Sequence, residues 1–248
     1  MPASSSESNV SPQLPTPGDT ARGHSFAREL DAFALEPTPA GLSLRALQRP
    51  DWDPLCLDWL SADVRRRILA GKKQLLPRAV GLHKKADALV ADATAGLGRD
   101  GFTLAALGAR VILIERHPLM VKLLLDARQR ALDSGERWAV AGAQRVEIVQ
   151  ADAREWLRAS QLPLDAAHLD PMYPEDGKTA LPQKSMQMLR ELTDGDDDSE
   201  DLLTAALASP AGRIAVKRPS KAPFLGERQP DAQLSATQAR YDVYLNRR

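Results

Sequence analysis

The sequence has little of what disulfide-bonded, zinc-binding or membrane proteins need. Cys56 is the single cysteine among 248 residues, which excludes an internal disulfide and any multi-cysteine zinc site. No apolar run approaches the roughly 18 residues of a membrane span, and the N-terminus lacks the basic start and apolar stretch of a secretory signal. We therefore expect a soluble protein of the cytoplasm.

The sequence also lacks net charge. Its 33 lysine and arginine residues balance 33 aspartate and glutamate residues, so the formal charge is +0. Whole-molecule attraction to nucleic acid is therefore not expected, and only a local basic patch could supply it. The hydrophobic fraction of 43% and the charged fraction of 27% are near ordinary globular usage, so the chain can bury a sizeable core.

Composition divides the chain into three parts. Ser and Pro dominate the start, and no apolar periodicity favours order there, so we expect a disordered tail over residues 1–22. Short apolar pieces broken by prolines follow, which predicts a small N-terminal appendage of brief strands and turns over residues 23–60. Residues 61–248 then form the main domain.

After Ala86, short apolar runs alternate with longer helical patterns. This alternation is typical of βαβ units, and it predicts an α/β fold with a mostly parallel sheet. The predicted strands are Ala88–Ala91, Val111–Ile114, Val146–Val149, Ala166–Leu169, Ile214–Val216 and a last strand around Tyr241, Val243 and Leu245, in a hairpin with residues near Leu234. The predicted helices are Phe102–Leu107, Leu119–Leu132 and one that begins near Met186.

Two charged segments stand out. The segment from Asp63 to Lys85 carries one acidic residue and a run of basic ones: Arg65, Arg66, Arg67, Lys72, Lys73, Arg78, Lys84 and Lys85. A solvated helix face and an RNA-binding surface both remain open for this segment. The segment Glu191–Asp201 gathers carboxylates without the spacing of a calcium loop, so we predict a solvated acidic loop and no metal.

A glycine-bearing turn follows the first predicted strand of the main domain. The string from Gly96 to Gly101 reads G-x-G-x-x-G, which keeps a dinucleotide cofactor in consideration. However, three residues separate Asp92 at the strand end from Gly96, whereas the dinucleotide turn places its first glycine almost directly after the strand. S-adenosylmethionine fits this acidic strand end better, since its amino acid end bears an ammonium group that Asp92 or Asp100 can bind.

Acidic residues follow the next two strands as well. Glu115 ends the second strand, where a carboxylate can accept protons from both ribose hydroxyls. Asp152 follows the third strand and can accept from the adenine amino group. Because ligands of open α/β sheets bind at the carboxyl ends of the strands, this series predicts a nucleoside-bearing cofactor there.

The most discriminating string, Asp170-Pro171-Met172-Tyr173-Pro174, follows the fourth strand. It resembles the Asp/Asn-Pro-Pro-aromatic motif of methyltransferases that modify exocyclic amino groups of bases. In such a site Asp170 and the Pro171 carbonyl accept the two amino protons, and Tyr173 stacks on the base, a contact worth roughly 1–3 kcal/mol. A structural turn is the alternative interpretation of this string. The string follows an apolar strand and lies downstream of the glycine turn, and this context favours a catalytic site.

Taken together, these motifs resemble the RsmJ family of bacterial small-subunit ribosomal RNA methyltransferases over roughly Leu35 to Leu245. The resemblance implies a Rossmann-like class I methyltransferase with helices on both sheet faces and a C-terminal antiparallel strand, and methyl transfer from S-adenosylmethionine to the exocyclic N2 of one guanosine in 16S rRNA, guanine 1516. The motifs that carry it are Asp92-Ala93-Thr94-Ala95-Gly96-Leu97-Gly98-Arg99-Asp100, Glu115-Arg116, Leu169-Asp170-Pro171-Met172-Tyr173-Pro174 and Val216-Lys217-Arg218-Pro219. The chain departs from the family in its glycine-rich basic run, represented only by Gly71-Lys72-Lys73-Gln74.

The expected contacts fall into two groups. For the cofactor, the glycine turn supplies Asp92, Gly96 and Gly98, and the resemblance adds Arg99, Asp100, Glu115, Arg116, Asp152, Ala153 and Asp170. For RNA phosphates, the candidates are Arg65, Arg66, Arg67, Lys72, Lys73, Lys217 and Arg218, with an exposed strand end as the alternative for the last two.

Two other functions remain open. An NAD-dependent oxidoreductase would use the glycine string and Glu115, and a noncatalytic RNA-binding or assembly protein would use the basic segment. The sequence also leaves open whether naked 16S rRNA or the assembled small subunit is the substrate.

Overall fold

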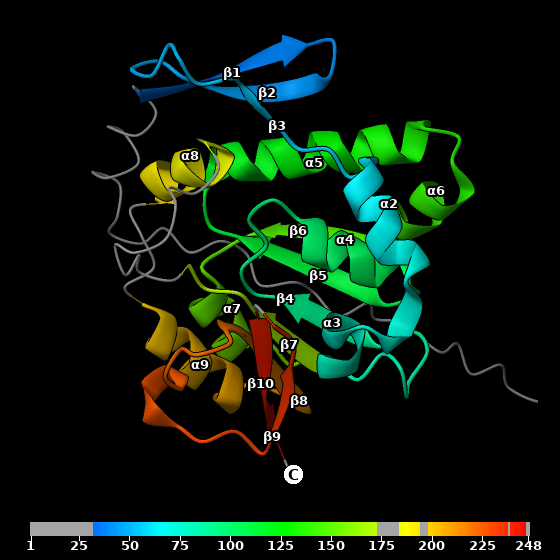
Figure 1. Cartoon of the computed structure of the whole chain (residues 1–248), viewed down its shortest axis with the longest axis vertical. Helices are drawn as coiled ribbons and strands as arrows, with labels where there is room; N and C mark the ends of the chain where they lie inside the picture. Colours follow the sequence, from blue (N-terminus) through cyan, green and yellow to red (C-terminus); the bar gives the residue numbers. More distant parts are fainter. Residues whose placement is uncertain (1–31, 173–183, 194–197, 238, 247–248) are drawn as a thin grey trace, which may run out of the picture.

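The computed structural model describes residues 32–172, 184–193, 198–237 and 239–246. The tail expected at residues 1–22 lies outside them. A seven-stranded sheet forms the centre of the molecule (Figure 1). Its strands, in spatial order, are β6 (Val146–Gln150), β5 (Arg110–Glu115), β4 (Leu89–Asp92), β7 (Ala166–Leu169), β8 (Arg213–Pro219), β10 (Ala239–Leu245) and β9 (Ala232–Ser235).

The first five strands of this order are parallel, and β10 is antiparallel to both of its neighbours. The chain runs outward from β4 through β5 to β6 and then returns to place β7 on the other side of β4. Strand order therefore reverses between β4 and β7, which is where open α/β sheets bind ligands.

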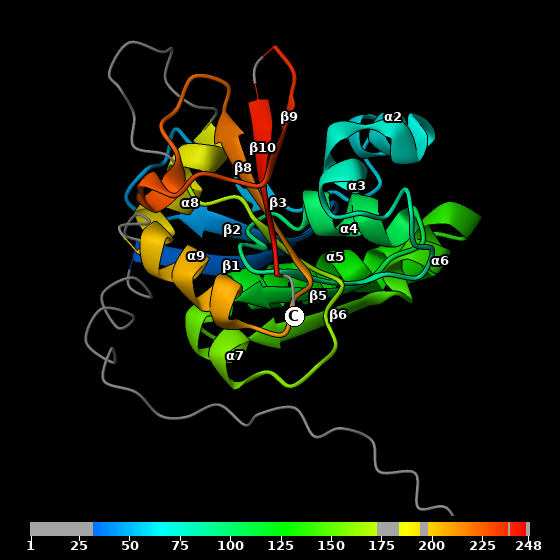
Figure 2. The same ribbon diagram turned by 90° about the horizontal axis from the view of Figure 1, so that it is seen from below.

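Side chains on β5 show how the sheet separates two cores. Val111 and Leu113 pack into one apolar cluster, and Ile112 and Ile114 into another, because successive side chains of a strand point to opposite faces. Helices α4 (Arg99–Ala106), α5 (Pro118–Asp133), α6 (Arg137–Ala143) and α8 (Lys184–Thr193) contribute to the first cluster, and α7 (Ala153–Ala159) and α9 (Ser199–Ala208) to the second (Figure 2). The predicted α/β fold with helices on both faces is confirmed.

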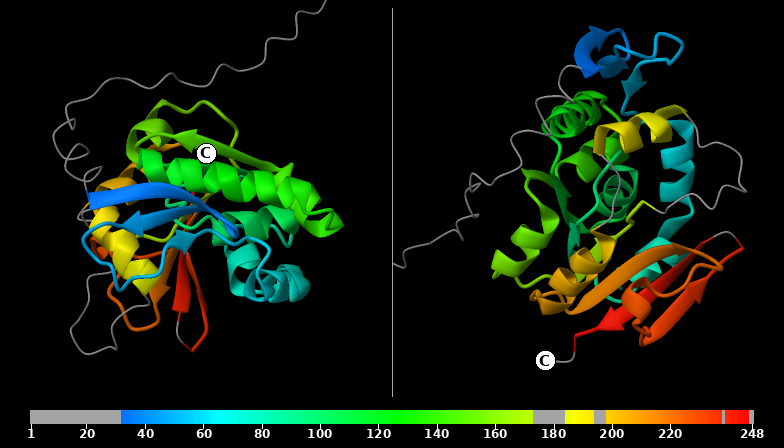
Figure 3. Two further views of the ribbon diagram at one scale, coloured as in Figure 1. Left: turned by 90° about the horizontal axis from the view of Figure 1, so that it is seen from above. Right: turned by 90° about the vertical axis from the view of Figure 1, so that its left-hand side faces the viewer.

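A small antiparallel sheet precedes the main domain. It consists of β1 (Phe33–Thr38), β2 (Gly41–Ala46) and β3 (Leu55–Cys56), and β2 packs on α5. It lies at the opposite end of the molecule from the C-terminal hairpin (Figures 1 and 3). The Arg130 side chain on α5 donates to the Leu57 carbonyl. This hydrogen bond links the segment directly after β3 to the main domain.

The main domain, predicted from residue 61 on, begins with a helical segment. It comprises α2 (Ala62–Leu69), the single turn η1 (Gly71–Lys73) and α3 (Leu75–Ala79). The Ser61 hydroxyl accepts from the Val64 backbone N–H at 3.4 Å and caps α2. Val64 is buried while Arg65 and Arg66 are exposed, so α2 presents basic side chains to solvent.

The predicted strands and helices are confirmed, with ends that coincide or shift by up to three residues. The interpretation of Glu191–Asp201 as a solvated acidic loop is wrong in the part that the structure describes. Glu191 lies in α8, and Glu200 and Asp201 form the first turn of α9, where carboxylates are stabilised by the positive end of the helix dipole.

Membrane spans and metal clusters are both absent from the described part of the chain. No described helix is long and apolar enough to cross a membrane. No group of three or more His, Cys, Asp or Glu side chains within the described ranges is arranged to hold a metal ion.

Candidate active site

A cleft of about 380 Å³ opens at the carboxyl ends of β4, β5 and β7, where the strand order reverses. Its volume is within the range of small-molecule sites. All ten residues predicted for the cofactor line it: Asp92, Gly96, Gly98, Arg99, Asp100, Glu115, Arg116, Asp152, Ala153 and Asp170. The structure thus brings together residues from separate stretches of the sequence.

The glycine turn takes a shape that favours glycine. Gly96 and Gly98 have φ values of 48° and 71°, in the left-handed region. A Cβ on Gly98 would also lie 2.6 Å from the Trp59 ring. Gly98 therefore allows both the turn and the close approach of Trp59.

Trp59 supports this turn from the N-terminal side of the chain. Its indole N–H donates to the Leu97 carbonyl at 3.0 Å, and its ring stacks on Phe102 with centroids 4.7 Å apart. We did not anticipate this contact from the sequence. No spacing signals it, because it depends on how the 57–61 connection folds back over α4.

Glu115 fastens the glycine turn to the end of β5. One carboxylate oxygen accepts from the Gly96 backbone N–H at 3.1 Å, and the other from the His117 backbone N–H at 2.9 Å. Burial raises the pKa of Glu115 above its ordinary value, although both N–H donors oppose the rise. Each oxygen keeps a further lone pair, which a ribose hydroxyl can use.

The next part of the cleft wall is a charge network. Asp152 caps α7 by accepting from the Arg154 backbone N–H, and its carboxylate also contacts the Arg154 guanidinium at 2.9 and 2.5 Å. Asp198, which precedes α9, lies 3.0 Å from both Arg116 and Arg154. Desolvation would raise the pKa of Asp152, but the hydrogen bonds from Arg154 and the charges of Arg154 and Arg116 together hold it below its usual range. Sequence reasoning missed Arg154 and Asp198, since only the fold brings them to Asp152.

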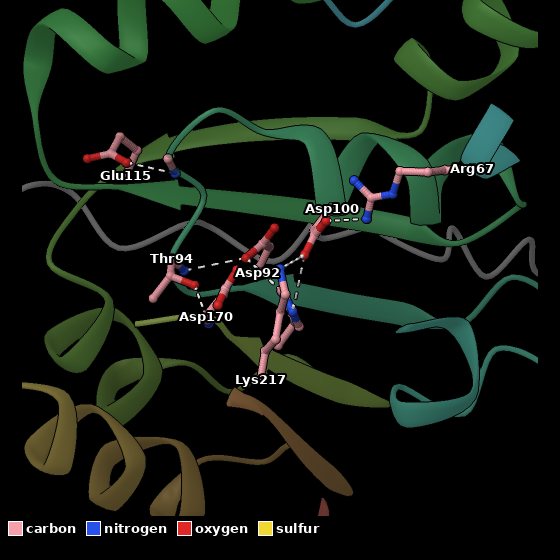
Figure 4. Close-up of polar contacts among 9 residues, drawn as sticks. Arg67, Asp92, Thr94, Asp100, Glu115, Asp170 and Lys217 are labelled. Atoms are coloured by element: carbon pink, nitrogen blue, oxygen red, sulfur yellow. Dashed lines mark hydrogen bonds and ion pairs between the residues drawn. The ribbon is translucent and has the colours of Figure 1, made fainter. Parts of the chain in front are cut away.

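Asp170 is fixed at the opposite side of the cleft. Its backbone N–H donates to the Thr94 hydroxyl at 2.7 Å, so the glycine turn holds the Asp-Pro motif in place (Figure 4). Its carboxylate receives the Lys217 ammonium at 2.7 Å, and the same ammonium lies 3.1 Å from Asp100. Arg67 reaches the other oxygen of Asp100 from α2.

A buried histidine lies beneath these charges. His168 Nδ1 is 3.1 Å from the Asp92 carboxylate, and both side chains are at most 2% exposed. Burial alone would lower the pKa of His168, but Asp92, Asp100 and Asp170 raise it above its ordinary value. Asp92, expected near the cofactor ammonium, thus also forms the floor of the cleft with His168.

The remaining predicted residues fall in different places. Pro171 is buried beside Asp170, and Tyr173 lies outside the described residues. Arg65, Arg66 and Lys73 are exposed on α2 and η1, and Lys72 is half-buried.

Four basic residues expected at RNA phosphates have protein partners. Arg66 pairs with Asp63 on the exposed surface of α2. Arg67 and Lys217 pair with carboxylates inside the cleft. Arg218 is 4% exposed and donates to the Pro223 carbonyl at 2.8 Å. The phosphate contact expected for Arg218 stays a prediction, and its side chain is buried in this structure.

Over most of its length, the chain is similar to known methyltransferases. The family model SAM_MT, which describes SAM-dependent methyltransferases, matches residues 22–246. Ribosomal RNA small subunit methyltransferase J of Pseudoalteromonas translucida is 39% identical over 224 residues, covering 89% of this chain and 88% of that protein. The same-named protein of Aeromonas salmonicida is 38% identical, covering 94% and 96%. A crystal structure of a SAM-dependent methyltransferase from Neisseria gonorrhoeae matches with a TM-score of 0.65 and 28% identity, covering 92% and 93%.

Proposed function

Because the chain belongs to the ribosomal RNA small subunit methyltransferase J family of SAM-dependent methyltransferases, we propose that it methylates the exocyclic N2 of one guanosine in 16S rRNA, guanine 1516. Family membership supports S-adenosylmethionine as the methyl donor and small-subunit ribosomal RNA as the substrate. The choice of an exocyclic amino group is supported by Asp170, which lines the cleft directly before Pro171. The family does not support the NAD-dependent alternative.

The residues of the cleft suit S-adenosylmethionine. Gly96 and Gly98 let the main chain approach a ligand, and Glu115 and Asp152 offer acceptors in succession along the strand ends. Asp100 lies near the other side of the cleft, where a carboxylate suits the ammonium of the amino acid end. When bound, this cofactor supplies a methyl group on a positively charged sulfur, which is open to direct displacement by an amine.

The protein's part in this chemistry is chiefly positioning. Asp170 and the Pro171 carbonyl accept the two protons of the guanine amino group, which turns the nitrogen's electron density toward the methyl donor. No covalent enzyme intermediate is needed. Desolvation raises the pKa of Asp170 although Lys217 opposes it, and this raised pKa lets the carboxylate take a proton as the methylated nitrogen loses its charge.

RNA docks on the exposed basic side chains next to the cleft. Arg65, Arg66 and Lys73 face solvent on α2 and η1, while Arg67 of the same helix reaches Asp100 inside the cleft. A molecule with no net charge thereby presents a local cationic surface beside the reacting site. The protein acts on this substrate in the cytoplasm, where ribosomal RNA is processed.

Mass spectrometric mapping of methylated guanosines in 16S rRNA tests this function. The rRNA is compared between cells with and without the protein, with a complemented strain as the control. We expect one N2-methylguanosine to disappear in the deletion strain and return on complementation. An unchanged modification map would contradict the proposal. Purified protein offered naked 16S rRNA or assembled subunits then identifies which of the two it accepts.

A further inference from the structure

The register of the sheet places Lys217 beside Asp170. In the β7–β8 ladder, His168 pairs with Ala215 and Leu169 with Val216. The next position along each strand is therefore Asp170 on one and Lys217 on the other. Ala215 packs in the same apolar cluster as α4, the helix that follows the glycine turn. Lys217 lies two residues further along the strand, so its side chain points to the same face of the sheet. The strand thus aims Lys217 into the cleft.

The Lys217 ammonium lies between two carboxylates. It is 2.7 Å from Asp170 Oδ2 and 3.1 Å from Asp100 Oδ2, and its side chain is 32% exposed (Figure 4). Arg67 also pairs with Asp100, but within the described residues Lys217 is the only ion-pair partner of Asp170. Without Lys217, the Asp170 carboxylate would lose this ion pair, while the Asp100 carboxylate would stay nearby and repel it.

We propose that Lys217 is a positioning residue, whose ammonium group holds the Asp170 carboxylate toward the guanine amino group and keeps it charged. This role rests on the proposed function, since it acts through Asp170. This role replaces the contact with an RNA phosphate that we expected for Lys217 because it lies next to Arg218 in the sequence. The two roles make opposite predictions for RNA binding and for the pH dependence of the rate.

The electrostatics agree with this geometry. Burial would lower the pKa of Lys217, but Asp100 and Asp170 outweigh it and raise the pKa above its usual range, so the ammonium persists at neutral pH. Lys217 in turn lowers the pKa of Asp170, against desolvation, which raises it. The charged and titratable groups around Asp170 are Lys217 on β8, Asp100 on α4, His168 on β7, Asp92 on β4, Arg67 on α2 and Tyr241 on β10.

The sign of the pH effect follows directly. An ionised Asp170 is the stronger acceptor of the guanine amino protons, so the rate falls as pH drops through the pKa of Asp170. Removal of Lys217 takes away a group that lowers this pKa and leaves Asp100, which raises it. The acid limb of the rate profile must then move to higher pH.

The test compares the purified Lys217→Met and Lys217→Arg variants with the wild type. Methyl transfer to 16S rRNA is measured as kcat against pH, and RNA affinity as Kd against salt concentration. We expect Lys217→Met to move the acid limb of kcat upward by at least about one pH unit and to leave the RNA Kd within about twofold and its salt slope unchanged. Lys217→Arg keeps a cation between the two carboxylates and should keep the acid limb near its wild-type position.

Lys221→Met is the matched control, because Lys221 is an exposed lysine four residues further along the chain. It should change neither the pH profile nor the RNA affinity. Lys217→Gln serves the same test if Met at this partly polar position prevents folding.

Two results would overturn the inference. A wild-type pH profile for both Lys217→Met and Lys217→Gln would show that the ammonium does not act through Asp170. Weakened RNA binding with a smaller salt slope and no pH shift would identify Lys217 as a phosphate contact. If the wild-type protein leaves 16S rRNA unmethylated, the proposed function fails first and the inference fails with it.

Discussion

At the scale of residues, each carboxylate of the cleft has different partners, and these determine what it can do. Glu115 and Asp152 accept hydrogen bonds from the backbone N–H groups of turns and helix starts. Asp92 pairs with a buried histidine, and Asp100 and Asp170 share an ammonium. The first pair is suited to hold a nucleoside, and the others form the floor and the reacting side of the cleft.

Glu115 provides a test of the cofactor side. Replacement of Glu115 by Ala removes the acceptor for the Gly96 and His117 N–H groups together with the acceptor proposed for ribose. We expect S-adenosylmethionine affinity to fall by at least about tenfold, the equivalent of one to two hydrogen bonds. Isothermal titration calorimetry measures this. Glu147→Ala, an exposed glutamate on the neighbouring strand, should bind as the wild type does; equal affinities for both variants would exclude the role of Glu115.

His168 provides a test of stability against pH. Its pKa in the folded protein is raised above 6.5, so the folded state binds the proton more tightly than the unfolded state. The stability that His168 contributes is therefore fully present below about pH 6.5 and is lost as the pH rises through the raised value. In urea unfolding, the free energy of unfolding of the wild type minus that of His168→Asn should shrink as the pH rises above about 6.5.

The exposed His83 gives the control for this measurement. His83→Asn should show a difference from the wild type that does not vary with pH. A constant difference for His168→Asn as well would contradict the assignment of a charged His168 beside Asp92.

At the scale of elements, the function depends on how the loops after β4 and β7 are joined. The Thr94 hydroxyl, in the first loop, accepts from the Asp170 N–H, in the second, at 2.7 Å. Because β4 and β7 are neighbouring parallel strands, this hydrogen bond holds the backbone of Asp170 against the glycine turn, while Lys217 contacts its carboxylate. The position of Asp170 thus depends on a residue of the glycine turn.

Replacement of Thr94 tests this junction. Thr94→Val keeps the shape but leaves the Asp170 N–H without its acceptor, which costs about 1–3 kcal/mol where the group is buried. We expect a loss of unfolding free energy in that range together with a lower kcat. Thr94→Ser retains the hydroxyl and should stay within about 0.5 kcal/mol of the wild type. If urea unfolding and methyl transfer do not distinguish the Val and Ser variants, the junction has no such role.

Strong local patterns predicted these elements well, and long-range contacts were not predictable. The strand at Ala166–Leu169 and the long helix predicted at Leu119–Leu132 were predictable, because their hydrophobic pattern is visible within a short stretch of sequence. The acidic segment was predicted as a loop, because in sequence the carboxylates of a helix start resemble those of a loop. In the structure, Leu202 and Leu203 directly after them are buried as part of α9. The charge pattern around Lys217 also suggested RNA, since only the sheet register reveals that Asp170 and Asp100 lie beside it.

At the scale of the whole molecule, charge is arranged locally although the total is zero. The basic residues of α2 and η1 lie next to the cleft. Inside the cleft, Asp100, Asp152 and Asp170 are paired with Arg or Lys side chains. Under the proposed function, RNA would meet positive charge beside the cleft, while three of the carboxylates inside it have cationic partners. Such an arrangement lets a neutral protein bind a polyanion at one face only.

Charge reversal on α2 tests this arrangement. The double variant Arg65→Glu/Arg66→Glu should weaken 16S rRNA binding and reduce the slope of log Kd against log salt by about one for each phosphate that is no longer bound. S-adenosylmethionine affinity should be unchanged, since neither side chain lines the cleft. Arg158→Glu, an exposed arginine on α7 at the other face of the sheet, is the control. An unaltered salt slope in the double variant would remove α2 from the RNA surface.

The central claim is that Asp170 directs a methyl group to the amino nitrogen of a guanine. Its most direct test is methyl transfer from isotope-labelled S-adenosylmethionine to 16S rRNA by the purified protein, with the product nucleoside identified by mass spectrometry. The account predicts N2-methylguanosine at one position with the wild type, and a rate lower by about a hundredfold or more with a folded Asp170→Ala variant. Undiminished transfer by Asp170→Ala, or label on a ring nitrogen or a ribose, would contradict it.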